Sequence, residues 1–61
     1  MDTYIGKVMR NPGLGGGYIV GDYPQPLDKN TPCEVLVNDN QWRKDEISDR
    51  LCNGPTVRIT V

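Results

Sequence analysis

The chain has 61 residues, of which 36% are hydrophobic; it contains one Trp and no Phe, and its formal net charge is -1. A chain of this length buries only about 60% of the surface that its unfolded form exposes, so we expect one small domain, residues 1–61, with a thin aliphatic core. The near-zero net charge gives no overall field for a polyanion, so any nucleic-acid site has to be a local patch. There is no histidine, which removes the commonest general base, and no enzyme is predicted.

No stretch reaches the roughly 18 apolar residues of a membrane span, and the start of the chain lacks the apolar run of a signal peptide. A cytoplasmic protein without a membrane partner is therefore expected. The only cysteines, Cys33 and Cys52, are then expected to be reduced and partly buried. Two cysteines without histidine fall short of the four ligands of a structural zinc site, and neither a metal nor another cofactor is predicted.

The first half of the chain indicates two strands. Residues 3–10 are rich in β-formers and run into Asn11-Pro12-Gly13, a combination that ends regular structure. Three glycines, 15–17, precede a second strand at 18–20. Residues 23–32 contain three prolines and predict a surface loop.

Residues 33–38 return to β character. Alternation places Cys33, Val35 and Val37 on one face, and Glu34, Leu36 and Asn38 on the other.

The segment 40–53 allows two interpretations. Trp42, Ile47 and Leu51 are spaced nearly as one helical stripe, with Asn40 and Gly54 as caps, which favours a short helix or helical turn. Trp42 is expected to anchor the core, because no other residue of the chain can fill that volume. The alternative is a tight turn at 38–40 followed by a short strand through Gln41 and Trp42.

The last segment, 55–61, alternates cleanly, with Val57, Ile59 and Val61 on one face. Four to five strands with one short helix or helical turn predict a mainly β fold, a small OB- or SH3-like barrel or half-barrel.

A binding face follows from the same alternation. With Val8, Ile19, Val35 and Val37 in the core, the residues expected on the other side of the sheet are Lys7, Met9, Tyr18, Val20 and Leu36. Together with the cations Arg10 and Arg58, such a face could stack unpaired bases and hold phosphates. The same surface is equally suited to a protein.

Four segments carry a family resemblance: Gly6–Val8, Asn11 with Gly15–Ile19, Val35–Val37 and Leu51–Val57. In this order they resemble the first strand, the turn with its glycine-aromatic motif, the third strand and the leucine-glycine-valine entry to the fourth strand of the cold-shock domain. That family is a small OB-type barrel that binds single-stranded RNA or DNA. Of the family's surface aromatics only Tyr18 stands at a matching position, with Gly16 and Leu36 at other aromatic places. The resemblance leaves no residues for a closing last strand, so an unpaired edge is expected.

These observations predict a small binding module for single-stranded RNA or DNA, with the candidate site Lys7, Arg10, Tyr18, Leu36 and Arg58. The alternative is a protein-binding adaptor or inhibitor that uses the same face or an open strand edge. A second copy of the chain could close such an edge and form a homodimer.

Overall fold

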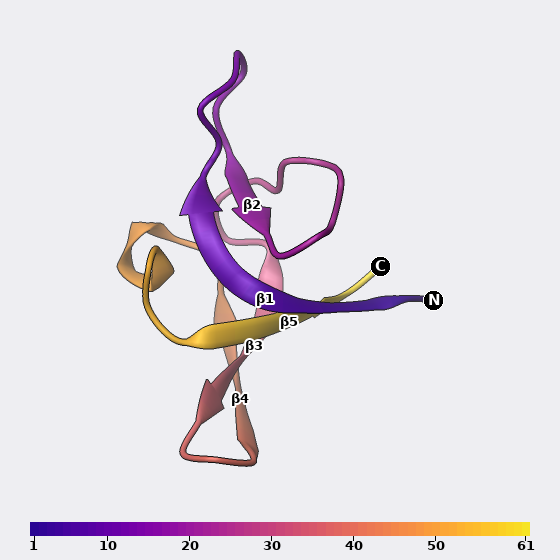
Figure 1. The fold of residues 1–61 in the computed structure, drawn as a ribbon, viewed down its shortest axis with the longest axis vertical. Coiled ribbons are helices and arrows are strands. Elements are labelled where there is room, and N and C mark those ends of the chain that lie inside the picture. Colours follow the sequence, from indigo (N-terminus) through magenta and orange to yellow (C-terminus); the bar gives the residue numbers. More distant parts are fainter.

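The chain folds into a single open β-sheet in the computed structural model, which describes residues 1–61. The elements are β1 (Thr3–Arg10), β2 (Tyr18–Val20), β3 (Pro32–Val37), β4 (Gln41–Glu46), the 3-10 turn η1 (Asp49–Leu51) and β5 (Thr56–Thr60). The spatial order is β2-β1-β5-β3-β4, and all pairings are antiparallel (Figure 1). The predicted mainly β class is confirmed. β2 and β4 are the two edges, and no ladder joins them.

The long strand β1 connects the two ends of the sheet because it pairs with two partners in succession. Its first part, Thr3–Lys7, pairs with β5, and its last part, Val8–Arg10, pairs with β2. Figure 1 shows the resulting bend of β1, with the β1–β2 and β3–β4 hairpins at opposite ends of the long axis. The strand bounds predicted for residues 3–10 and 18–20 are confirmed.

The bend brings two glycines into contact. A Cβ atom on Gly6 would lie 2.4 Å from the Cα of Gly21, and one on Gly21 would lie 2.7 Å from the carbonyl oxygen of Ile5. Gly21 also has a φ of 49°, a left-handed conformation that favours glycine. The chain leaving β2 can therefore cross β1 closely only because both positions lack a side chain.

The core lies on one side of this bent sheet and contains nine buried side chains. They are Val8, Tyr18, Val20, Cys33, Val35, Ile47, Leu51, Val57 and Ile59. Burial of each aliphatic side chain contributes on the order of 1.5–3 kcal/mol to folding. The predicted alternation of β3 and β5 is confirmed, since Cys33 and Val35 on β3 and Val57 and Ile59 on β5 are all buried.

The predicted helical segment at 40–53 is wrong for its first half, where the alternative strand is correct. β4 pairs with β3 over six residue pairs, from Pro32 opposite Glu46 to Val37 opposite Gln41. The turn between them starts at Asn38, whose φ is 57°. Helical structure is limited to the three residues of η1. No helix here has the length and apolar character needed to cross a membrane.

The spacing of Trp42, Ile47 and Leu51 misled the sequence interpretation because only two of the three share a side. Ile47 and Leu51 are buried, whereas Trp42 is half-buried and lies outside the core cluster. The predicted role of Trp42 as a core anchor is therefore wrong. The aromatic residue of the core is Tyr18, which is only 5% exposed.

Candidate functional site

The side of the sheet opposite the core carries a mixture of apolar and charged side chains, which we call the outer face. Strand register places on it Ile5, Lys7 and Met9 of β1, Ile19 of β2, Glu34 and Leu36 of β3, Trp42 and Lys44 of β4, and Arg58 of β5. The side chains of Lys7 and Met9 are exposed there as predicted, while Leu36 and Arg58 are half-buried. Three of the five predicted site residues, Lys7, Leu36 and Arg58, therefore share one face.

Tyr18 and Val20 do not lie on this face, and that part of the prediction is wrong. Both are buried in the core, because Val20 stands opposite Val8, and Tyr18 lies two residues away on the same side of β2. Ile19, predicted to be buried, is consequently the β2 residue of the outer face, where it stands opposite Met9. Three residues contain too little alternation to set their own phase, and the pairing with β1 sets it here.

Arg58 and Trp42 form the centre of the outer face. The guanidinium carbon of Arg58 lies 4.3 Å from the centroid of the Trp42 ring, a cation–π contact. The Nε of Arg58 donates a hydrogen bond of 2.7 Å to Oε1 of Glu34, its neighbour across the β3–β5 ladder. This hydrogen bond lowers the pKa of the Glu34 carboxyl group. The guanidinium is therefore held in place between a ring and a carboxylate.

Apolar side chains lie on both sides of this stack. Ile5 stands opposite Arg58 on β1, and Leu36 stands opposite Trp42 on β3. Ile5 and Met9 are 57% and 56% exposed, which is large for apolar side chains in the middle of a sheet. The outer face therefore presents Ile5 and Trp42 beside one ordered arginine, and Met9 farther along β1, in the β1–β2 hairpin.

A shallow hollow of about 330 Å³ adjoins the stack. It is lined by Pro32, Cys33, Glu34, Lys44, Arg58 and Thr60. The β3–β5 ladder holds only two residue pairs, so these strands are not joined where the hollow lies. Two cations and one carboxylate surround it, which makes it suited to a polar or acidic group.

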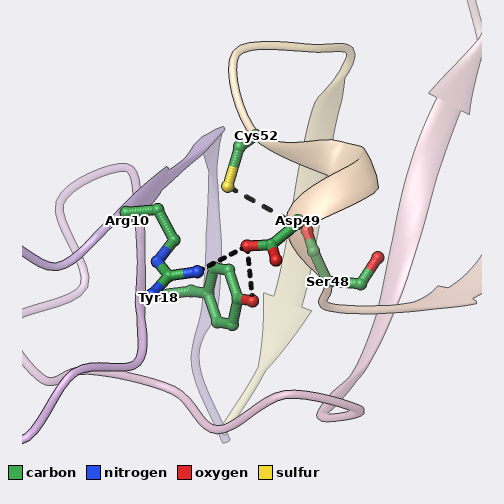
Figure 2. Close-up of polar contacts among 5 residues, drawn as sticks. All are labelled: Arg10, Tyr18, Ser48, Asp49 and Cys52. Atoms are coloured by element: carbon green, nitrogen blue, oxygen red, sulfur yellow. Dashed lines mark hydrogen bonds and ion pairs between the residues drawn. The ribbon is translucent and has the colours of Figure 1, made fainter.

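Arg10 and Tyr18 belong to a second cluster on the core side, centred on Asp49 at the start of η1 (Figure 2). Oδ1 of Asp49 accepts hydrogen bonds from Nη1 of Arg10, at 2.7 Å, and from the Tyr18 hydroxyl, at 2.8 Å. The Arg10 guanidinium carbon also lies 5.2 Å from the centroid of the Tyr18 ring. Figure 2 shows both side chains directed at the same carboxylate oxygen, so the cluster ties η1 to the β1–β2 hairpin.

The electrostatics of this cluster keep all three groups in their ordinary protonation states. The hydrogen bonds from Arg10 and Tyr18 lower the pKa of Asp49, and the bond to Asp49 raises the pKa of both Arg10 and Tyr18. A tyrosine whose hydroxyl is committed to a carboxylate, and whose pKa rises, is poorly suited to transfer a proton near neutral pH. The cluster therefore holds η1 against the β1–β2 hairpin. The charge of Arg10 is already neutralised by Asp49.

The two cysteines are both free, Cys33 buried and Cys52 half-buried. Burial raises the pKa of the Cys33 thiol, which disfavours the reactive thiolate. The Sγ of Cys52 lies 4.0 Å from the carbonyl oxygen of Ser48, as a weak hydrogen bond within the η1 segment (Figure 2). No group of three His, Cys, Asp or Glu side chains is placed to hold a metal ion.

Sequence reasoning missed the main aromatic residue of the outer face, Trp42, and its apolar neighbours Ile5 and Ile19. A signal for Trp42 was present, because a tight turn at 38–40 followed by an antiparallel return sets Trp42 opposite Leu36, on the side away from Val35. Ile5 shares parity with Lys7 and Met9 on β1, so it too belonged with the outer residues.

No protein-family model matches this chain, and no curated protein or solved structure shows significant similarity to it.

Proposed function

We propose that this chain is a non-enzymatic protein-binding module whose outer face contacts a partner protein. The observation that carries the proposal is the exposure of Ile5 and Met9, each more than half exposed, on the same face as the single tryptophan. Apolar side chains gathered on one face of a small protein commonly mark an interaction site.

The chemistry around Trp42 fits this function. Trp and Arg are the residue types that contribute most often to the central energy of protein interfaces. Arg58 is already ordered by its hydrogen bond to Glu34 and its contact with the Trp42 ring, so little side-chain freedom remains to be lost on binding.

Charge also favours a protein partner over a nucleic acid. Of the three cations predicted to hold phosphates, Arg10 is paired with Asp49 and Arg58 with Glu34. Lys7 is the one that forms no ion pair. Two neutralised cations and a net charge of -1 would contribute little counterion release on binding a polyanion.

A matched pair of variants tests the outer face. Met9→Asp places a charge in the face, and Leu14→Asp makes the same change at an equally apolar side chain, fully exposed on the 11–17 loop away from the sheet. The immobilised wild-type chain first captures a partner protein from the cells of origin. This partner is then identified, purified and titrated against the wild type and the two variants. Binding should be lost in Met9→Asp and kept in Leu14→Asp. Equal binding by the two variants would contradict the proposal.

Single-stranded nucleic-acid binding is a second candidate, favoured by one observation. The Trp42 ring lies on the outer face with Lys44 and Lys7, so a base-stacking residue stands there even though Tyr18 is buried. Oligo(dT) and oligo(U) titrations followed by Trp42 fluorescence test this candidate, which predicts quenching that weakens as salt rises. Unchanged fluorescence at low salt would exclude it.

A further inference from the structure

The two edges of the sheet differ in what covers them. The outer edge of β2 is paired with the following loop, where Tyr18 and Leu27 exchange backbone hydrogen bonds of 2.7 and 2.8 Å. β4 pairs with β3 only and has no strand on its other side. The six-residue strand β4 is therefore the open edge of this fold.

Alternation identifies which backbone groups of β4 face outward. Beyond the end of β4, the N–H and C=O of Ile47 are bonded toward the β3 side, to Thr31 and Asn30. In an antiparallel ladder the bonding direction alternates with each residue, so Trp42, Lys44 and Glu46 direct their backbone groups away from β3. The N–H of Glu46 accordingly bonds to a side chain, Oδ1 of Asp45, at 2.7 Å.

One end of this edge is blocked and the other is open. The Asp45 carboxylate that covers the Glu46 N–H is itself held by Arg50, with N–O distances of 2.8 and 2.9 Å. The backbone N–H groups of Trp42 and Lys44 have no such cover, because no side chain bonds to either. The open part of the edge is thus centred on Trp42, Arg43 and Lys44.

The charge of this open part is positive. Arg43 is exposed on the core side of β4 and Lys44 on the outer face, and neither forms an ion pair. Two neighbouring carboxylates are already paired, Glu34 with Arg58 and Asp45 with Arg50. Both cations flank a row of unpaired backbone groups, next to the half-buried Trp42.

We propose that the β4 edge binds an extended acidic segment of the partner protein as an additional antiparallel strand. The segment bonds to the backbone of Trp42 and Lys44, places acidic side chains against Arg43 and Lys44, and sets an apolar side chain against Trp42. Read along the segment, this requires two successive acidic residues followed by an apolar one. The inference rests on the proposed protein-binding function and states which part of the partner is recognised and how.

Proline at position 44 separates backbone pairing from charge. Lys44→Pro removes the outward N–H without touching a β3–β4 hydrogen bond, and proline is tolerated on edge strands. Lys44→Ala removes the same charge and keeps the N–H, so it is the matched control. The probe is a displayed library of short random peptides selected on the wild-type chain, followed by titration of the enriched peptides.

The enriched peptides should contain the acidic-acidic-apolar order. Lys44→Ala should weaken their binding a few-fold and Lys44→Pro by about a further tenfold, the loss of one backbone hydrogen bond at an interface. In the wild-type chain, the bound peptide should slow amide hydrogen exchange at Trp42 and Lys44 and leave Arg43, already bonded to β3, unchanged. This second measurement does not depend on the proline variant folding.

Three results would overturn the inference: enrichment without acidic residues, equal binding by the two Lys44 variants, or unchanged exchange at Trp42 and Lys44. Loss of partner binding in Met9→Asp, with the two Lys44 variants equal, would overturn the edge alone and leave the outer-face proposal standing. A wild-type chain that binds neither a partner nor a peptide would overturn both.

Discussion

At positions 6 and 21 the fold accepts only glycine, because an added Cβ atom would overlap the neighbouring backbone. The backbones of β1 and of the chain leaving β2 approach so closely at these residues that a Cβ on Gly6 would overlap Gly21. The overlap involves backbone atoms, which cannot move aside without shifting the ladder between β1 and β2. The bend of the sheet therefore depends on these two positions.

Gly6→Ala is expected to lower the free energy of unfolding by about 1–3 kcal/mol, the range for an overpacked site. Gly13→Ala is the control, because its added Cβ would meet nothing closer than Oδ1 of Asn11, at 3.4 Å, and it should stay within about 0.5 kcal/mol of the wild type. Urea denaturation of both variants measures the difference, and equal stabilities would show that the two segments do not meet.

Substitutions at Tyr18 test whether its ring lies in the core and not on the outer face. As a buried core side chain it should cost about 3–5 kcal/mol when changed to Ala. Tyr18→Phe keeps the ring and removes only the hydroxyl that bonds to Asp49, so it should cost much less than Tyr18→Ala. Denaturation midpoints of the two variants decide this, and a stable Tyr18→Ala chain would instead place the ring at the surface.

At the scale of elements, the β3–β4 hairpin decides where the tryptophan goes. Its turn starts with Asn38 at a φ of 57°, and the strands then pair over six residue pairs, which puts Trp42 opposite Leu36. Asn is tolerated in this left-handed conformation because its short polar side chain bonds locally. The hairpin thus fixes both the outer-face position of Trp42 and the open edge of β4.

Asn38→Ala should reduce stability by about 1–2 kcal/mol, because alanine is disfavoured at positive φ. Asn38→Gly should retain the wild-type stability, since glycine adopts this conformation without steric cost. Asn40, in the same turn but not at positive φ, supplies the control Asn40→Ala. Thermal unfolding followed by circular dichroism measures all three, and an unaffected Asn38→Ala chain would contradict the turn geometry.

For the whole molecule, three ion pairs hold segments together: Arg10–Asp49, Arg50–Asp45 and Arg58–Glu34. The first and the third join residues 39 and 24 positions apart in the chain, and the second joins residues five apart. Each lowers the pKa of its carboxyl group, through the hydrogen bond from the arginine. With nine buried residues the chain has a small core, so these contacts matter for the pH range in which it stays folded.

Stability should therefore fall on acidification. A carboxyl group whose pKa is lower in the folded chain stabilises the fold fully when the pH is above its pKa in the unfolded chain. That pKa is 4.5 for Glu34 and 3.8 for Asp45 and Asp49. The stabilisation is lost as the pH falls through the lower pKa of the folded chain. Urea denaturation across pH 2–7 should show a plateau above about pH 5 and a decline below it. Asp49→Asn should make the decline shallower; a decline of unchanged steepness would contradict the role of this pair.

Local sequence patterns predict the mainly β class, the bounds of the strands at 3–10 and 18–20, and the buried faces of β3 and β5. They can do so because alternating apolar residues and turn-forming glycines, prolines and asparagines act locally. They also place Lys7, Met9, Leu36 and Arg58 together on one face.

The remaining features depend on contacts between strands. A three-residue strand such as β2 contains too little alternation to set its own phase, and its pairing with β1 turns Tyr18 and Val20 inward and Ile19 outward. Pairing with β3 likewise made residues 41–46 a strand and moved Trp42 from the expected core to the outer face. The ion pair that joins Arg10 to Asp49 across 39 residues of chain depends on the same long-range register, which no local pattern encodes.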